Sequence, residues 1–255
     1  MLRFFAFILV AAFSIKQANS TELKVAVASN FKSTAQKIAQ AFEQKTGHKV
    51  TLIGGSTGAL YSLIYHGAPY DIFLSADQER PQKLIKNELA YTESLMTYAL
   101  GQLAFWMPQQ TNITTKNITQ LIKQQTGKLA IANPRLAPYG KSSLFFIKKN
   151  VLQSTVKNKL IKGNNITQTL QFVASGNAQS GFVSFSELLH AGITDHFVLI
   201  EPNAYPPIKQ QGVILNRTKH LSIAQEFMTF LGNQGCDIIL MSGYSLPQHE
   251  SKGSE

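Results

Sequence analysis

The chain has 255 residues, of which 44% are hydrophobic and 15% are charged. These proportions suit one large or two modest globular domains and exclude a disordered chain. The formal net charge is +10, yet no basic run is longer than Lys148-Lys149, so nucleic-acid binding is not expected. We expect instead a basic surface that attracts anions. The single cysteine, Cys236, excludes an internal disulfide.

Residues 1–20 have the pattern of a cleavable signal peptide. Arg3 gives a positive start, residues 4–13 form a short apolar stretch, and residues 18–20 (ANS) are small enough for cleavage. The apolar stretch is too short to cross a bilayer, although Lys16 shortly after it leaves an uncleaved anchor as an alternative. We therefore expect an exported protein.

Strand-like and helix-like runs alternate along the mature chain. This alternation predicts βα units around mostly parallel sheets, and therefore an α/β fold. The predicted strands are residues 23–28, 50–53, 70–75, 102–107, 128–132, 181–185, 196–200 and 212–215. The predicted helices are residues 31–46, 58–66, 78–90, 140–152, 165–175 and 221–231.

Two strand-to-helix junctions in the first half of the chain carry hydroxyl groups. The first predicted strand ends at Ser29-Asn30, and the second ends at Gly54-Gly55, which Ser56-Thr57 follows. A Ser or Thr at such a junction caps the helix, and the glycines let a guest approach the backbone. The first amides of a helix have no partner inside it and carry partial positive charge. Each junction therefore predicts an anion site.

Two similar junctions follow in the second half, at residues 133–142 and 164–168. Each helix start carries roughly half a positive charge, so four that converge could balance about a dianion without any Lys or Arg. The junctions form two groups, near residues 29 and 57 and near residues 139 and 166. This grouping favours two lobes with a cleft between them; one continuous sheet and a barrel are the alternatives.

A set of short motifs extends this pattern over nearly all of the mature chain. In order they are residues 28–31 (ASNF), 55–58 (GSTG), 67–77 (GAPYDIFLSAD), 132–134 (ANP), 137–140 (APYG), 165–169 (NITQT), 175–178 (SGNA) and 181–183 (GFV). Together they resemble the periplasmic molybdate-binding proteins that serve ABC importers. Any one of them alone would not be specific.

The resemblance implies a two-lobed periplasmic binding protein fold with mostly parallel sheets and a central ligand cleft. We expect residues 21–103 plus 210–255 to form the first lobe and residues 104–209 to form the second. The implied function is capture of molybdate, and also of tungstate, for delivery to the membrane permease of an ABC importer. From this resemblance we expect the protein to be a monomer that needs no cofactor and is not an enzyme.

The resemblance also implies a set of ligand groups. Some family members place a Tyr hydroxyl in the cleft near the position that Ser184 occupies here, so that contact departs from the pattern. No metal-ion ligands are expected, because the scattered histidines have no ligand spacing. The implied anion-binding residues are Ser29, Asn30, Ser56 and Thr57 on the first lobe, and the backbone amides of Tyr139 and Ile166 on the second.

These six residues favour a fully ionised dianion. None of them brings the carboxylate that hydrogen phosphate would need as an acceptor for its proton. Molybdate, tungstate and sulfate carry no proton near neutral pH. Sulfate differs from molybdate in size, which the sequence does not measure, so only the resemblance favours molybdate. A sulfate or other oxyanion binder is the alternative within this class.

A secreted serine hydrolase is the alternative from a different class. Residues 29–32 (SNFK) fit S-x-x-K, and residues 45–47 (KTG) fit K-T-G. The two motifs lie at opposite ends of one predicted helix, and no S-D-N motif occurs. Asp71 and Asp77 could also be paired carboxylates for acid–base chemistry. The favoured reading is structural: Asp77 caps the helix that begins near Gln78, and Asp71 ends a turn.

Overall fold

The computed structural model describes residues 21–247, so the predicted signal peptide lies outside the described residues. The described chain contains two sheets of five strands each. The first sheet has the order β2 (Lys49–Gly55), β1 (Glu22–Ala28), β3 (Ile72–Leu74), β10 (Ile208–Ile214), β4 (Met96–Gly101). The second has the order β7 (Leu160–Gly163), β6 (Leu129–Ala132), β8 (Ser180–Ser184), β5 (Leu103–Trp106), β9 (Phe197–Leu199).

Both sheets are mixed in the same way. Pairing is parallel among β2, β1 and β3 and among β7, β6 and β8, and it is antiparallel where β10 or β5 takes part. The expected two-lobed α/β architecture is confirmed, with the parallel pairing in the half of each sheet that carries the βα units. The single sheet and the barrel are wrong for the described chain.

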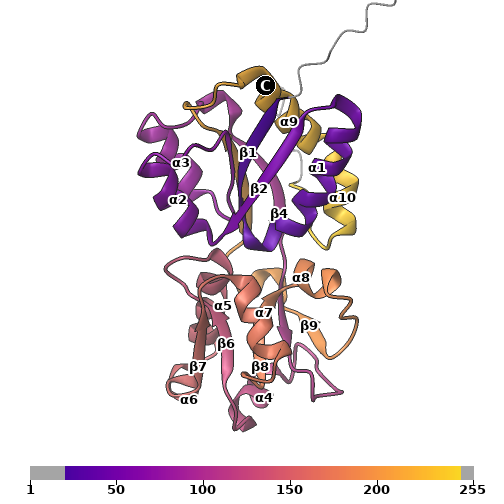
Figure 1. Cartoon of the computed structure of the whole chain (residues 1–255). Helices are drawn as coiled ribbons and strands as arrows, with labels where there is room; N and C mark the ends of the chain where they lie inside the picture. The colour runs from indigo at the N-terminus through magenta and orange to yellow at the C-terminus, as the bar shows by residue number, and fades with distance from the viewer. Residues whose placement is uncertain (1–20, 248–255) are drawn as a thin grey trace, which may run out of the picture.

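Helices cover both sheets, and Figure 1 shows the two lobes one above the other. Around the first sheet lie η1 (Ser29–Phe31), α1 (Lys32–Thr46), α2 (Thr57–Tyr65), α3 (Glu79–Lys86), η2 (Thr92–Ser94), α9 (Leu221–Gly232) and α10 (Gly235–Met241). Around the second lie α4 (Ile118–Gln124), α5 (Pro138–Lys149), α6 (Gln153–Val156), α7 (Ile166–Ala174), α8 (Phe185–His190) and η3 (Pro202–Ala204).

Each sheet separates two apolar layers, because successive side chains of a strand point to opposite faces. On β1, Val25 and Val27 join one cluster while Ala26 joins another. On β5, Phe105 and Trp106 divide in the same manner. The two lobes therefore have separate cores, each held by burial on both faces of its own sheet.

The chain passes between the two sheets twice within the described residues. Strand β4 ends at Gly101 and β5 begins at Leu103; later β9 ends at Leu199 and β10 begins at Ile208. Two strands had no counterpart in the predictions, β4 and β7. Strand β4 (MTYALG) lacks a clear period, and β7 (LIKG) is very short. No helix in residues 21–247 has the length and apolar character to cross a membrane.

Candidate anion-binding site

The register of the first sheet aligns two of the predicted junctions. Strands β1 and β2 are parallel, and Ala28 at the end of β1 pairs with Gly55 at the end of β2. The residues that come next, Ser29 and Ser56, therefore leave the same edge of the sheet side by side. Ser56 is the N-cap of α2, where its Oγ accepts a hydrogen bond from the Ala59 amide at 3.4 Å, as the sequence predicted.

The hydroxyl groups of Ser29, Ser56 and Thr57 in the first lobe can each donate a hydrogen bond to a ligand. Thr57 Oγ1 accepts from the Ala76 amide at 3.3 Å, and Ser56 Oγ accepts from its helix as described above. Both hydroxyls act as acceptors toward the protein, so their O–H groups remain available to a ligand. The Ser29 hydroxyl has no hydrogen-bond partner among the residues that the structure describes. These three groups can therefore act as donors toward an anion.

Asn30 is placed differently from its neighbours. Its side-chain Nδ2 donates to Gln210 Oε1 at 2.9 Å and contacts the Tyr244 hydroxyl at 3.2 Å. Its carbonyl accepts a hydrogen bond from that hydroxyl at 2.6 Å. The side chain is only 3% exposed. Since its amide group is engaged inside the first lobe, the group that Asn30 can offer to an anion is its backbone N–H.

The register of the second sheet repeats the arrangement of the first. Ala132 at the end of β6 pairs with Gly163 at the end of β7, and both strands are parallel. The loops to α5 and α7 therefore leave the same edge. Asn165 caps α7 by accepting from the Gln168 amide at 2.8 Å. Ile166 is the first residue of α7, and its amide has no partner inside the helix.

Tyr139 is the second residue of α5, which begins with Pro138. Its amide also belongs to the unpartnered first turn of a helix. The ring is buried, with 1% of the residue exposed, and the hydroxyl has no partner among the described residues. Burial raises the pKa of this phenol well above its usual value. The hydroxyl packs against Gly101, where any side chain would collide with it.

Contacts across the two lobes bring the four junctions together. The Gly58 amide at the start of α2 donates to the Leu136 carbonyl at 2.9 Å, in the loop before α5. Ser186 Oγ on α8 donates to the Asn30 carbonyl at 3.3 Å, and η1 also contacts α7. The start of α2 thus faces α5, and η1 faces α7 and α8 (Figure 1). The lobes are closed on each other.

Ser184, at the position where some family members place a Tyr hydroxyl, bonds within its own lobe in this structure. Ser184 is fully buried; its Oγ accepts from the Glu187 amide and donates to the Glu187 carboxyl at 3.1 Å. Glu187 is a residue that the sequence analysis missed. The Ser-x-x-Glu spacing of a helix capping box was the signal that could have identified it.

The carboxylates considered for acid–base chemistry hold the first lobe together. Asp77 Oδ1 accepts from the Arg80 amide at 3.0 Å and its carboxylate pairs with the Arg80 guanidinium. It therefore holds the first turn of α3, although the N-cap residue itself is Gln78. Asp71 accepts from the Lys24 amide at 2.7 Å and from the Thr218 hydroxyl at 2.7 Å. The two do not act as a pair.

The hydrolase motifs also fail to form a site. Lys32 is exposed and makes no hydrogen bond to Ser29 in the described part of the chain. The K-T-G segment ends α1 one helix length away. Residues 21–247 contain no group of His, Cys, Asp and Glu that could hold a metal ion.

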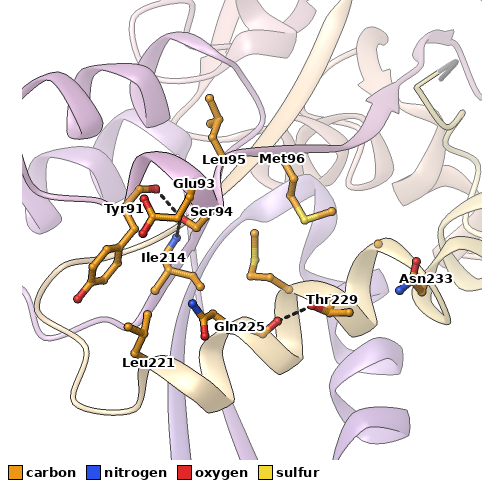
Figure 2. A pocket seen from close by; sticks show the side chains of 12 residues that line it. Tyr91, Glu93, Ser94, Leu95, Met96, Ile214, Leu221, Gln225, Thr229 and Asn233 are labelled. Carbon is orange, nitrogen blue, oxygen red and sulfur yellow. Dashed lines mark hydrogen bonds between the residues drawn. The ribbon is translucent and has the colours of Figure 1, made fainter. Parts of the chain in front are cut away.

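Two pockets of the described chain can be compared with the candidate site. A pocket of about 290 Å³ between η2 and α9 is lined by Tyr91, Met96 and Gln225 among others, and contains none of the six predicted residues (Figure 2). A second pocket, of about 440 Å³, is lined by Glu79 on α3 and Lys141 on α5. This second pocket lies where the two lobes meet. Neither pocket is lined by any of the six predicted residues, so the candidate site rests on the chemistry of its donors and not on a pocket.

Known proteins share this architecture and much of this sequence. A family model for bacterial extracellular solute-binding proteins matches residues 23–245. The molybdate-binding protein ModA of Azotobacter vinelandii is 39% identical over 232 residues, covering 90% of this chain and 92% of that protein. ModA of Rhodobacter capsulatus is 35% identical over 228 residues, covering 89% of each.

A solved structure agrees with these sequence relatives. The periplasmic molybdate-binding protein of Azotobacter vinelandii superimposes with a TM-score of 0.82 at 34% identity, covering 89% of this chain and 100% of that one. The similarity confirms the periplasmic binding protein fold that the motifs implied. These relatives are named as molybdate-binding proteins, and none of their names supports a hydrolase.

Proposed function

The chain belongs to the family of bacterial extracellular solute-binding proteins, and from this premise we propose that it captures molybdate, and also tungstate, for an ABC importer. Four helix starts that meet across the two lobes carry this proposal. They bring hydroxyl and amide donors but no charged side chain of their own. Two relatives named as molybdate-binding proteins, each covering about nine-tenths of the chain, support the choice of ion.

We propose that Ser29, Ser56 and Thr57 donate their hydroxyl protons to the anion, and that Asn30 donates its backbone N–H. The backbone amides of Tyr139 and Ile166 complete the set from the second lobe. All these groups would contact oxygens of the ion and not the metal centre. Because every member is a donor, a fully ionised dianion suits the site better than hydrogen phosphate does. Charge-assisted hydrogen bonds of this kind contribute about 1.5–3 kcal/mol each.

The lobes are proposed to comprise residues 21–103 plus 210–255 and residues 104–209, apart from the crossings, where Leu103 pairs in the second sheet and Ile208 and Lys209 pair in the first. Since the donors are divided between them, the anion completes its contacts only when the lobes meet. The ion therefore selects the closed form over an open one. Small-angle scattering should give a smaller radius of gyration with molybdate than without it. Identical curves at saturating molybdate would mean that one rigid lobe holds the ion.

The proposed setting follows from this role. A cleaved signal in residues 1–20 would direct the chain to the periplasm, where it would act as a monomer. The closed protein would then dock on the membrane permease of its importer and release the ion there. No cofactor is needed, because the only small molecule in this function is the cargo.

The test is a panel of oxyanions measured against the unfolding temperature. A ligand that binds only the folded protein adds about 2.7 kcal/mol of stability at 100 times its dissociation constant. Molybdate and tungstate should raise the midpoint, sulfate should raise it less, and phosphate should not raise it. A stronger effect of sulfate would support the alternative oxyanion binder. A panel without any effect would contradict the proposal.

A further inference from the structure

A buried carboxyl group lies beside the second-lobe half of the site. Glu187 on α8 is only 9% exposed. One carboxyl oxygen accepts a hydrogen bond from Thr167 Oγ1, and the other accepts from Ser184 Oγ at 3.1 Å. No ion pair of the described residues includes Glu187. A carboxylate in this position therefore has hydrogen bonds but no cation to balance its charge.

The surroundings of Glu187 contain few groups that titrate. Strands β8 and β9, helix α7 and η1 pack against α8, and none of these elements carries a charged or titratable side chain. The segment at Gly243 also packs against Phe185 and Leu189 of α8, and it is followed by the titratable Tyr244. His190 lies on α8 itself and is exposed. Glu187 acts electrostatically on two buried tyrosines, Tyr139 and Tyr244, and burial raises the pKa of both. Tyr98 and Tyr205 act in turn on Tyr139. Burial also raises the pKa of Glu187 to about 7.

Hydrogen bonds connect this carboxyl group to both sides of the cleft. Thr167 directly follows Ile166 at the start of α7. On the other side, Ser186 Oγ lies 3.3 Å from both Ser184 Oγ and the Asn30 carbonyl oxygen, so its single proton can be donated to either of them. Glu187 thus lies between two of the helix starts that are proposed to hold the anion.

We propose that Glu187 is a proton-linked positioning residue: a dianion bound at the starts of η1 and α7 draws one proton from solvent onto the Glu187 carboxyl group. The inference rests on the proposed function. A negative ion beside an unbalanced carboxylate favours the protonated form of that carboxyl. The protonated group can donate its O–H to Thr167 or Ser184, and that hydroxyl is then free to turn its own proton elsewhere.

The simpler reading is that Glu187 only completes the capping box of α8. A capping residue would stabilise the fold but would not change its protonation when an anion binds. The two readings therefore differ in the number of protons exchanged on binding. Glu187→Gln separates them, because the amide has the shape of the protonated carboxyl and cannot titrate.

The experiment is calorimetric titration of the protein with sodium molybdate in pairs of buffers of different ionisation enthalpy. At about pH 8, where Glu187 is mostly ionised before binding, the wild type should take up close to one proton per ion. At about pH 5.5 it should take up almost none. Its dissociation constant should rise by up to about tenfold per pH unit above pH 7. Glu187→Gln should take up no proton from this site, and its affinity should stay flat across this range.

Each outcome decides a different claim. Equal proton uptake by the wild type and Glu187→Gln would overturn the proton linkage while leaving the anion site intact. Failure of the wild type to bind molybdate at either pH would overturn the proposed function itself. Thr167→Val is a second variant in case the first does not fold. It removes a hydrogen bond that favours the ionised carboxyl of Glu187, so the decline in molybdate affinity should begin at a higher pH than in the wild type. A pH profile of affinity identical to that of the wild type would also count against the inference.

Discussion

The two lobes differ in the kind of donor that we propose for the anion. In the first lobe the proposed donors are chiefly side-chain hydroxyls: that of Ser29, which has no partner within residues 21–247, and those of Ser56 and Thr57, which accept from backbone amides. In the second lobe they are backbone amides at the starts of α5 and α7. A hydroxyl is lost when its residue changes, whereas a backbone amide is lost only to proline. The first half of the proposed site would therefore depend on residue type and the second half on helix geometry.

The largest expected effect is on the backbone half. Ile166→Pro deletes the proposed amide donor at the first position of α7, where proline fits a helix well. Asn165 before it has φ −145° and ψ 178°, an extended conformation that a following proline allows. We expect molybdate affinity to fall by about two decades, measured by calorimetry, as for the loss of one charge-assisted bond.

Ile166→Ala is the matched control for this prediction. It removes the same buried side chain, which is 2% exposed in the wild type, but it keeps the amide. Its stability should fall by about 2–5 kcal/mol, while its affinity should stay close to that of the wild type. Equal affinities of the proline and alanine variants would remove the Ile166 amide from the site.

Thr57→Val tests the hydroxyl half and should also destabilise the fold. It removes the proposed donor, for an expected affinity loss of one to two decades, or about 1–3 kcal/mol. It also leaves the buried Ala76 amide without its acceptor, which should cost about 1–3 kcal/mol of unfolding free energy in a urea titration. Thr57→Ser keeps the hydroxyl and should lose little of either. A Val variant with full affinity would contradict the donor role.

Ser29→Ala should show the same chemistry without the cost in stability. Its hydroxyl has no partner among the described residues, so unfolding in urea without ligand should shift by no more than about 0.5 kcal/mol. Affinity for molybdate should fall by about tenfold. A large loss of stability together with unchanged affinity would assign Ser29 to the fold and remove it from the site.

The smallest effect should come from charges at the rim. Lys141 on the second lobe pairs with Glu79 on the first at 2.8 Å, and hydrogen bonds from Lys141 and Lys83 lower the pKa of Glu79 to about 2. The pair is about half exposed, so Glu79→Gln should weaken the closed form by only about 0.2–1 kcal/mol. The affinity loss should be at most about fivefold and should disappear at high salt.

The pH dependence of this contribution has a definite sign. Since the folded pKa of Glu79 lies below its unfolded value of 4.5, its stabilisation is present above that value and is lost as pH falls toward 2. Lys32→Ala is the control, because Lys32 is exposed and lies in no ion pair of the described chain; it should change affinity by no more than a factor of about three. Losses from either variant as large as that of Thr57→Val would mean that charge holds the ion.

Much of this organisation could be predicted from local sequence. The run Val25–Val27 and the caps Ser56 and Asn165 depend on neighbours a few residues away, so period and capping chemistry predicted them. The twofold grouping of the junctions likewise indicated two lobes. Strands β4 and β7 were not predicted because neither has a clear alternating pattern. Their neighbours in the sheet determine that they are strands.

Only the tertiary structure decided how the groups meet. Strand β10 inserts between β3 and β4 although more than a hundred residues separate it from either. That insertion brings Gln210 to Asn30, and it commits the Asn30 side chain to the first lobe. The tertiary structure likewise brings the Glu187 carboxyl group into contact with Thr167, a contact that no sequence motif predicted. Sequence by itself determined which residues could donate to an anion, because donor chemistry and helix starts are local. The partners that restrain or free those donors come from distant segments, so burial and pairing across the two lobes decided them.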